Sequence, residues 1–186
     1  MANISTKALQ MPASAIRKLV PLADAAKKQG TKVYHLNVGQ PDIKSPKCAL
    51  DAIRNYSAEN VSYSHSAGLM ELRKGLVEKY YKKIGIDITV DELIVTVAGS
   101  ESVNLALEIA CNPGDEVIVL EPFYTNYNTF AFMNGLTLKA IPTDIRNGFQ
   151  VPPIEEFEKA ITEKTKAILV CNPGNPTGTQ YSKESM

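Results

Sequence analysis

The sequence predicts an α/β protein in which a mostly parallel sheet lies between two layers of helices, a three-layer α/β/α sandwich. From residue 92 onward, short apolar stretches alternate with longer stretches of helical spacing. The apolar stretches contain few polar residues, which is typical of strands buried on both faces. The chain has 186 residues, 44% of them apolar, which is enough for one domain with a substantial core.

Four elements are expected before residue 92. A helix over Ser14–Gly30 has apolar residues along one face, and Pro21 inside it should kink or split it. A short strand over Lys32–Asp42 is broken by its own Gly-Gln-Pro sequence. A helix over Ser45–Tyr56 has its first serine as N-cap, and a second helix over Leu69–Gly85 carries apolar residues at helical spacing.

The remainder of the chain alternates between strand and helix patterns. Strands are expected over residues 92–97, 116–122, 136–142 and 166–172, and helices over residues 100–111, 126–135 and 154–161. The helix over 100–111 is apolar on most sides, so we expect it to be buried. The last residues, from Thr179 to Met186, resemble the start of another helix, and we therefore expect this chain to be part of a longer protein.

Composition argues against several classes of protein. Twenty basic residues balance twenty acidic ones, so no charge excess indicates nucleic acid as a partner. No apolar run approaches the roughly 18 residues of a membrane span, and the first residues lack the pattern of a secretory signal. With two histidines and no clustered cysteines, no metal site is expected. The wide spacing of Cys48, Cys111 and Cys171 fits a reducing, cytoplasmic setting.

The carboxyl ends of three predicted strands carry residues suited to a ligand, and ligands bind at these ends in open α/β sheets. At the first, in VTVAGSES, the strand passes into a helix through Gly99, Ser100 and Glu101. Free amides at a helix N-terminus form a site for phosphate or carboxylate. Ordinary capping of the helix is the alternative explanation.

An aromatic cluster follows the second strand end, in EPFYTNY. Phe123, Tyr124 and Tyr127 come directly after Pro122. A planar ring at a strand end can stack on a flat ligand. The alternative is that these rings pack into the following helix.

The third strand end, ILVCNPGNPTG, contains more turn residues than a simple turn needs. Asn-Pro occurs twice before Thr-Gly, and a near-copy, CNPGD, occurs at residues 111–115. Pro173 and Pro176 stiffen the loop, so Asn175 is held ready to bond a polar group. An anion cradle, a stacking ring and an amide together suit a flat, phosphorylated, heteroaromatic ligand. The GxGxxG and GxxxxGK(S/T) patterns of two nucleotide-binding folds are absent from the sequence.

Five motifs occur in order along the chain: LNVGQPD, YSHSAGLMELRKGL, VTVAGSES, NPGDEVIVLEPFYTNY and NPGNPTG. In this order and spacing they resemble the pyridoxal-phosphate-dependent aminotransferases of class I, the aspartate aminotransferase-like enzymes of fold type I. The resemblance extends from Ala13 onward. It implies pyridoxal 5′-phosphate as cofactor, with an amino acid and a 2-oxo acid as substrates. It also implies an N-terminal arm and small-domain segment over residues 1–45, and an incomplete cofactor-binding large domain over residues 46–186.

The resemblance assigns cofactor-binding roles to residues of these motifs. The phosphate-binding turn matches Gly99, Ser100 and Glu101, the ring that stacks on the pyridine matches Tyr124, and the residue that bonds the phenolic oxygen matches Asn175. Many members of the family carry Trp or Phe at the position of the stacking ring, so a tyrosine keeps the stacking role.

Two residues from the earlier motifs are assigned in the same way. Gly39 matches the glycine whose amide meets the substrate carboxylate, although Gln40 stands where the common motif has Glu. Tyr63 matches the tyrosine that reaches the cofactor phosphate of the neighbouring subunit, which implies a homodimer with shared active sites. The alternative for Tyr63 is packing beneath the helix that follows it.

No lysine of this chain matches the family's Schiff-base lysine. Lys164, Lys166 and Lys183 lie before or just after NPGNPTG, whereas that lysine follows the motif at a distance. The resemblance therefore implies that the Schiff-base lysine lies beyond Met186. No catalytic residue is assigned, and the chain alone is expected to be inactive.

Two other functions remain open at this point. Because related enzymes share these motifs, a β-lyase or an aminocyclopropane-carboxylate synthase-like enzyme is an alternative to an aminotransferase. A non-catalytic phosphate-binding module is a further alternative, which the missing lysine favours and the five ordered motifs disfavour.

Overall fold

The computed structural model describes residues 3–14 and 16–186, and its contacts divide the chain into two compact units. The first unit comprises residues 1–38 and 102–186, and the second comprises residues 39–101. These boundaries differ from the predicted division at residue 45, because the N-terminal segment groups with the sheet. The assignment of residues 1–45 to the small domain of the family remains a prediction.

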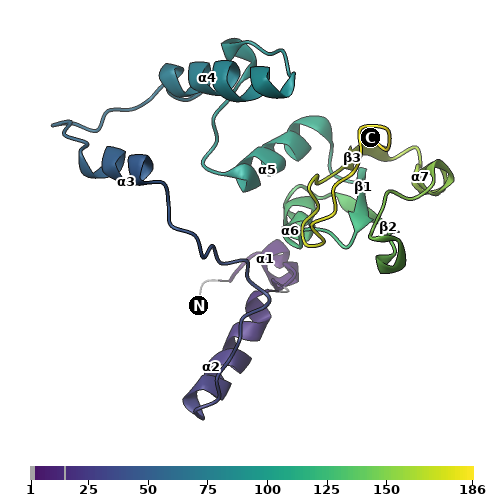
Figure 1. Ribbon diagram of the computed structural model, residues 1–186. Coiled ribbons are helices and arrows are strands. Elements are labelled where there is room, and N and C mark those ends of the chain that lie inside the picture. Colours follow the sequence, from purple (N-terminus) through teal and green to yellow (C-terminus); the bar gives the residue numbers. More distant parts are fainter. Residues whose placement is uncertain (1–2, 15) are drawn as a thin grey trace. The chain divides into compact units, whose positions relative to one another are not determined.

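A three-stranded parallel sheet is the centre of the first unit (Figure 1). Its strands are β1 (Glu116–Glu121), β2 (Thr137–Pro142) and β3 (Thr165–Leu169), in the order β2-β1-β3. Glu116 is paired with Thr137 on one side of β1, and Val117 with Ala167 on the other. The three strands predicted in this region and their parallel pairing are therefore confirmed.

Successive side chains of β1 point to opposite faces of the sheet, and a layer of helices packs against each face. Val117 and Val119 face the layer formed by α5 (Gly99–Ala110) and α6 (Asn126–Met133). The intervening Ile118 packs with residues of α7 (Ile154–Ala160) on the other face. The side chains of these three strand residues are fully buried, and each contributes about 1.5–3 kcal/mol to folding. The predicted three-layer α/β/α arrangement is confirmed.

The connections between strands create a change of direction beside β1. The chain passes from β1 through α6 to β2 on one side, then returns through α7 to β3 on the other side of β1. The carboxyl ends of β1 and β3 therefore meet at a topological switch point, where open α/β sheets bind their ligands.

The turn between α6 and β2 shows why the sequence ends that helix there. Gly135 adopts a positive φ of 68°, and the amide of Leu136 donates to the Ala131 carbonyl at 2.8 Å. A Cβ on Gly135 would lie 3.2 Å from the side chain of Pro113. Glycine at this position therefore allows both the left-handed conformation and the close approach to the preceding turn.

The N-terminal segment of the first unit contains α1 (Thr6–Gln10), a 3₁₀ turn at Arg17–Leu19 and α2 (Val20–Lys28). Pro21 lies in the first turn of α2, where its missing N–H costs nothing. The change from the 3₁₀ turn to α2 falls at Val20, just before Pro21, and the chain passes from one to the other without a break, so a kink or split at Pro21 stays a prediction. Ala15, within that prediction, lies outside the described residues. The Nζ of Lys7 donates to the carbonyl of Met133 at 2.6 Å, which joins α1 to the end of α6 (Figure 1).

The second unit contains α3 (Lys47–Arg54) and α4 (Met70–Leu76), which continues as a π-helical turn at Val77–Tyr81. A 3₁₀ turn at Lys82–Ile84 then ends at Gly85, as predicted. The N-cap of α3 is Pro46 and makes no side-chain capping bond, so the predicted serine cap is wrong.

Two predicted strands are wrong, those over Lys32–Asp42 and residues 92–97. The described part of the chain holds no strand in either range, and a 3₁₀ turn at Val90–Glu92 leads into the second. A strand needs a neighbouring strand to satisfy its backbone groups. The amide of Val95 donates to the carbonyl of Ala67 at 3.0 Å, but in the described part of the chain no ladder of strand pairing forms over either range. Val97, for example, is 93% exposed. The prediction that α5 is buried on most sides is also wrong, because only its Leu107 is buried.

The segment from Thr179 to Met186, which resembles the start of a helix, does not form one in this chain. It contains turns at residues 183–185 and no helical residue. The Ser182 hydroxyl accepts from the amide of Ser185 at 3.2 Å, so the predicted capping serine does make a capping-type bond. The helix predicted to follow it is absent from the described residues up to Met186.

Within residues 3–14 and 16–186, no helix combines the length and apolar character needed to cross a membrane. Over the same residues, no group of three His, Cys, Asp or Glu side chains could hold a metal ion.

Candidate functional site

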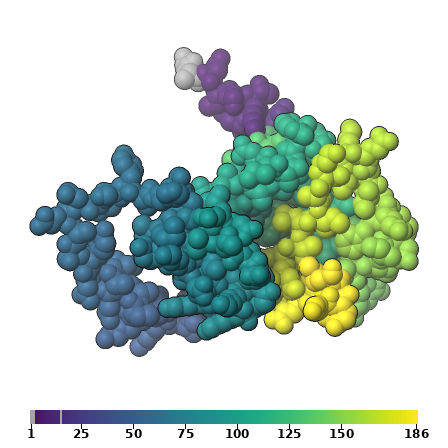
Figure 2. Space-filling view, turned by 90° about the horizontal axis from the view of Figure 1, so that it is seen from above, coloured from purple at the N-terminus to yellow at the C-terminus, as the bar shows by residue number. Residues whose placement is uncertain are grey.

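A small cavity of about 20 Å³ lies at the switch point between the carboxyl ends of β1 and β3. Phe123 and Tyr127 line it after β1, and Cys171, Asn175 and Tyr181 line it after β3. Its enclosed part has room for about one water molecule, but the side chain of Asn175 is exposed. Figure 2 shows the yellow C-terminal segment, which includes this loop, at the surface. A ligand can therefore reach Asn175 from solvent.

Tyr127 is the buried centre of the aromatic cluster. Its ring stacks on Phe123 at 6.2 Å between centroids and meets Tyr124 edge-on at 5.5 Å. Burial, followed by a hydrogen bond with the Cys171 thiol, raises the pKa of Tyr127 to about 12. Its side chain is only 7% exposed, so Tyr127 is a neutral, fixed wall of the cavity at physiological pH.

Tyr124 lies on a different cavity from Asn175. Its hydroxyl accepts a hydrogen bond from Nδ2 of Asn126 at 2.7 Å. Both residues line a cavity of about 570 Å³ together with the N-terminal segment, including Arg17 and Asn37. Tyr124 also packs against the core beneath α6, as the packing alternative expected. Phe123 lines the strand-end cavity together with the rings of Tyr127 and Tyr181, and the resemblance assigned it no role.

The loop that carries Asn175 is closed by its own hydrogen bonds. The amide of Gly174 donates to the carbonyl of Thr179 at 2.8 Å, and the amide of Gly178 donates to the carbonyl of Gly174 at 2.8 Å. A Cβ on Gly174 would lie 2.6 Å from Oγ1 of Thr177, so glycine suits this tight turn. In the described part of the chain, the amide side chain of Asn175 has no hydrogen-bond partner. A preorganised loop thus presents one free amide.

The start of α5 agrees only in part with the predicted anion site. The amide of Glu101 donates to the carbonyl of Ala98 at 3.0 Å, so its prediction as a free donor is wrong. The Glu101 carboxylate turns back to accept from the amide of Val97 at 2.6 Å. The earlier amides, of Gly99 and Ser100, have no acceptor inside the helix. A Cβ on Gly99 would meet no atom within 4 Å, so the space there is open.

Gly39 and Tyr63 belong to the second unit, and both are exposed. A Cβ on Gly39 would also meet no atom within 4 Å, so its backbone is accessible to a ligand. Tyr63 is 106% exposed, and the alternative that it packs beneath the following helix is wrong. Its predicted contact with a neighbouring subunit remains a prediction.

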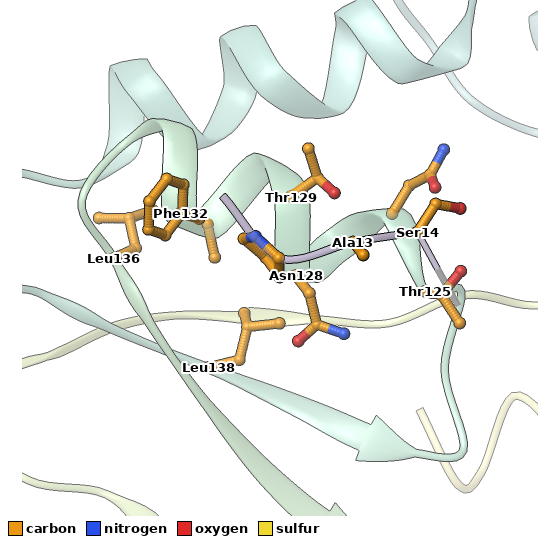
Figure 3. Close-up of a pocket in the computed structure, with 11 residues that line it drawn as sticks. Ala13, Ser14, Thr125, Asn128, Thr129, Phe132, Leu136 and Leu138 are labelled. Carbon is orange, nitrogen blue, oxygen red and sulfur yellow. The ribbon is translucent and has the colours of Figure 1, made fainter. Parts of the chain in front are cut away.

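A third cavity, of about 340 Å³, lies along α6 and is closed on one side by residues 12–14 (Figure 3). Asn128, Thr129 and Thr125 contribute its polar groups, and Phe132 and Leu138 contribute apolar ones. Oγ1 of Thr125 is buried and unpaired among the described residues. This cavity is lined by α6 and the beginning of β2, and so it is not the candidate site.

Met186 lies on a fourth cavity, of about 520 Å³, on the α7 face of the sheet. Phe157 of α7 and Ile168 of β3 line it as well, and its walls are mostly apolar. No lysine lines this cavity or the strand-end cavity, so neither places a candidate Schiff-base lysine in the described part of the chain. The prediction that this lysine lies beyond Met186 stays a prediction.

Comparison with known proteins gives one consistent family. The family model described as aminotransferase class I and II matches residues 31–186. The aspartate/prephenate aminotransferase of Thermus thermophilus is 35% identical over 185 residues, 99% of this chain and 48% of its own length. The aspartate aminotransferase of Thermotoga maritima is 32% identical over 182 residues, 97% of this chain and 48% of its own length.

Solved structures agree with the sequence relatives. Alanine aminotransferase from Pyrococcus furiosus is 37% identical, with a TM-score of 0.87 over 98% of this chain and 47% of its own. The aspartate aminotransferase of Thermus thermophilus with maleate is 34% identical, with a TM-score of 0.85 over 100% of this chain and 48% of its own. The chain spans about half the length of these relatives. It belongs to the aminotransferase class I and II family, with the α/β sandwich of fold type I.

Proposed function

We propose that this chain provides the pyridoxal-phosphate-binding part of an aminotransferase, which moves an amino group from an amino acid to a 2-oxo acid. The observation that supports this most directly is the free amide of Asn175. It stands on a closed loop at the switch point of a parallel sheet. An ordinary strand-to-helix turn has no need of a preorganised, unpaired amide.

The groups of the chain fit this cofactor by their chemistry. Pyridoxal phosphate offers a phosphate, a flat ring and a phenolic oxygen. Open space at Gly99 beside the first amides of α5 suits the phosphate, with the Ser100 hydroxyl nearby. Tyr124 supplies a ring, and Asn175 supplies an N–H donor for the phenolic oxygen. Because the amide of Glu101 already donates to Ala98, Glu101 cannot bind the phosphate through it, and its carboxylate only orients the turn through the amide of Val97.

Bound pyridoxal phosphate supplies an electron sink for the substrate carbon that loses its proton, and the protein positions the cofactor. In our proposal Gly99 and Ser100 hold the phosphate, and Asn175 fixes the ring's rotation by bonding its phenolic oxygen. The resemblance gives Tyr124 the role of covering one face of the ring, although in this chain Tyr124 lines a different cavity from Asn175. The amide of Gly39 meets the substrate carboxylate.

The choice of an aminotransferase over a lyase or a binding module is supported by the relatives, whose names describe aminotransferases. The exposure of Tyr63 supports a homodimer, in which its hydroxyl reaches the phosphate held by the neighbouring subunit. A cytoplasmic location is supported by three cysteines that are all free.

Equilibrium dialysis of pyridoxal phosphate against the 186-residue chain tests the cofactor assignment. We expect Asn175→Ala to weaken binding about tenfold, the value of a hydrogen bond to a charged oxygen. Gly99→Val should weaken binding more strongly without lowering stability, because its side chain enters open space. Asn112→Ala, in the near-copy motif, is the matched control. Wild-type affinity in both site variants would refute the assignment.

Borohydride reduction tests the proposal that the lysine which holds the cofactor covalently lies beyond Met186. Incubation of the 186-residue chain with pyridoxal phosphate and borohydride should give no stoichiometric adduct at a single lysine, and the chain should not transaminate. General bases and nucleophiles each contribute orders of magnitude in rate, so a missing lysine abolishes turnover. One uniquely labelled lysine, identified by peptide mass, would contradict this.

A further inference from the structure

We propose that Asn172 is a positioning residue that holds the loop of residues 172–181 closed, so that Asn175 faces the strand-end cavity. The purpose of this positioning rests on the proposed function. The positioning itself rests on contacts within the first unit.

The side chain of Asn172 binds both backbone groups of one residue. Its Nδ2 donates to the carbonyl of Tyr181 at 3.3 Å, and its Oδ1 accepts from the amide of Tyr181 at 3.1 Å. This pair of bonds imitates the pairing of two strands, with a side chain in place of one backbone. It therefore closes the loop across nine positions.

The two bonds between Asn172 and Tyr181 form a clamp, and its Tyr181 end is anchored in the core. The ring of Tyr181 packs against Ile118, Leu120 and Ile141 on the α7 face of the sheet. Because Asn172 lies shortly after the end of β3, the clamp ties the end of a strand to a residue fixed by packing. The loop between these two points has little freedom left.

Two inner contacts complete the enclosure. Oγ1 of Thr179 donates to the carbonyl of Gly148 at 2.9 Å, which fixes the outgoing side of the loop. Cys171 donates from its thiol to the carbonyl of Pro173 at 3.2 Å, which fixes the incoming side. Asn175 lies between these fixed sides, so its direction depends on the clamp.

The near-copy motif offers an internal control for this role. Asn112 occupies the same position in CNPGD, but there the backbone amide, rather than the side chain, makes the hydrogen bond, to the Asp115 carboxylate at 2.7 Å. Removal of the Asn112 amide group therefore removes no comparable clamp. The two asparagines differ in structure although their sequence surroundings match.

Amide hydrogen exchange in the 186-residue chain tests the clamp without any cofactor. In Asn172→Ala we expect the amides of Gly174 and Gly178 to exchange about tenfold faster, because two bonds that close the loop are lost. The buried amides of β1 should keep wild-type protection, which separates local opening from general destabilisation. Asn172→Asp keeps the acceptor for the Tyr181 amide but sets a carboxylate oxygen against the Tyr181 carbonyl, so it should also accelerate exchange. Asn112→Ala should leave both glycine amides unchanged.

Equal acceleration in Asn112→Ala and Asn172→Ala would overturn the proposal, as would unchanged exchange in Asn172→Ala. Loss of protection across β1 in both Asn172 variants would also overturn it, because the residue would then support the whole unit.

Pyridoxal phosphate binding, measured by dialysis, connects the clamp with Asn175. We expect Asn172→Ala to weaken binding about tenfold, and to cause no further loss when Asn175→Ala is already present. An equal loss in both backgrounds would show that Asn172 acts independently of Asn175 and would refute positioning. If the wild-type chain binds no pyridoxal phosphate but the exchange contrast holds, the clamp stands and the proposed cofactor site fails.

Discussion

The motifs CNPGD at residues 111–115 and CNPGN at residues 171–175 share four residues, but they lie at opposite ends of the parallel strands. The first connects α5 to the amino end of β1, and the second follows the carboxyl end of β3. In the first, the carboxylate of Asp115 accepts from the amide of Asn112, and the amide of Gly114 donates to the carbonyl of Gly135 at 2.8 Å. In the second, the fifth residue, Asn175, remains unpaired among the described residues.

This difference indicates that position in the sheet, more than the letters, decides what a turn can do. At the amino end of β1, the polar groups of the motif bond to the motif's own backbone, and the turn only connects α5 to β1. At the carboxyl end of β3, the loop is closed by bonds between Asn172 and Tyr181, so the side-chain amide of Asn175 stays free to bind a ligand. Parallel sheets bind ligands at the second of these ends. Four pairs of measurements test this comparison.

The largest difference concerns alkaline pH, because the second motif borders a buried tyrosine. Tyr127 ionises at about 12 in the folded chain and near 10 when unfolded. Between these values the unfolded state has lost a proton that the folded state keeps, so the free energy of unfolding falls as pH rises. The contribution is intact below pH 10, falls by about 1 kcal/mol at pH 11 and by up to about 3 kcal/mol once pH passes 12.

Urea unfolding at several pH values measures this loss, with Tyr127→Phe as the matched variant. The variant should lack the part of the decline that lies between pH 10 and 12. Cys111, at the first motif, also has a raised pKa, mainly from burial. Its contribution should be lost earlier in the alkaline range and persist in Tyr127→Phe. Identical alkaline profiles for the wild type and this variant would contradict the burial of Tyr127.

Serine substitutions of the two motif cysteines should differ in stability. Cys111 is 8% exposed, and among the described residues its thiol has no hydrogen-bond partner. Cys111→Ser therefore buries an unpaired hydroxyl and should cost about 1–3 kcal/mol. In Cys171→Ser the new hydroxyl can donate to Pro173, as the thiol does, so the cost should stay within about 0.5 kcal/mol. Denaturant midpoints give both values, and a reversed order would contradict the assigned burial.

The sequence predicts much of the first unit because its signals are local. The strand around Val119 carries apolar residues for both faces, and that pattern needs no knowledge of its neighbours. The stretch around Val97 has the same apolar character but no partner strand among the described residues, so the prediction fails there. Strand pairing is a long-range property that a pattern along the chain does not contain.

The candidate site divides in the same way. Asn175 is predicted from its motif, whereas the roles of Asn172 and Tyr181 depend on a loop that closes over nine positions. The engagement of the Glu101 amide depends on how the helix begins. A hint of the clamp did exist in the sequence, because one free amide explains only one of the two asparagines in CNPGNPTG.

Alanine at the two motif glycines should separate conformational strain from steric crowding. Gly114 has a φ of 95° and open space around a Cβ, so alanine there costs about 1–2 kcal/mol through its backbone alone. Gly174 has no positive φ, but its Cβ would press on Thr177. Since that side chain can rotate, Gly174→Ala should cost less than about 1 kcal/mol while it disturbs the loop. Thermal unfolding compares the stabilities, and faster exchange of the Gly178 amide only in Gly174→Ala would support the distinction.

The smallest expected effect on stability is the one that separates the motifs most sharply. Asp115→Ala removes the acceptor for the amide of Asn112 and should cost about 0.5–1.5 kcal/mol. Asn175→Ala removes an exposed side chain without a partner, so the free energy of unfolding should change by less than about 0.5 kcal/mol. In dialysis against pyridoxal phosphate the order should reverse, with wild-type affinity in Asp115→Ala and about tenfold weaker binding in Asn175→Ala. A residue kept for folding cannot produce that reversal, because its loss would lower stability first. If Asn175→Ala destabilises the chain as much as Asp115→Ala, the second motif is a turn like the first.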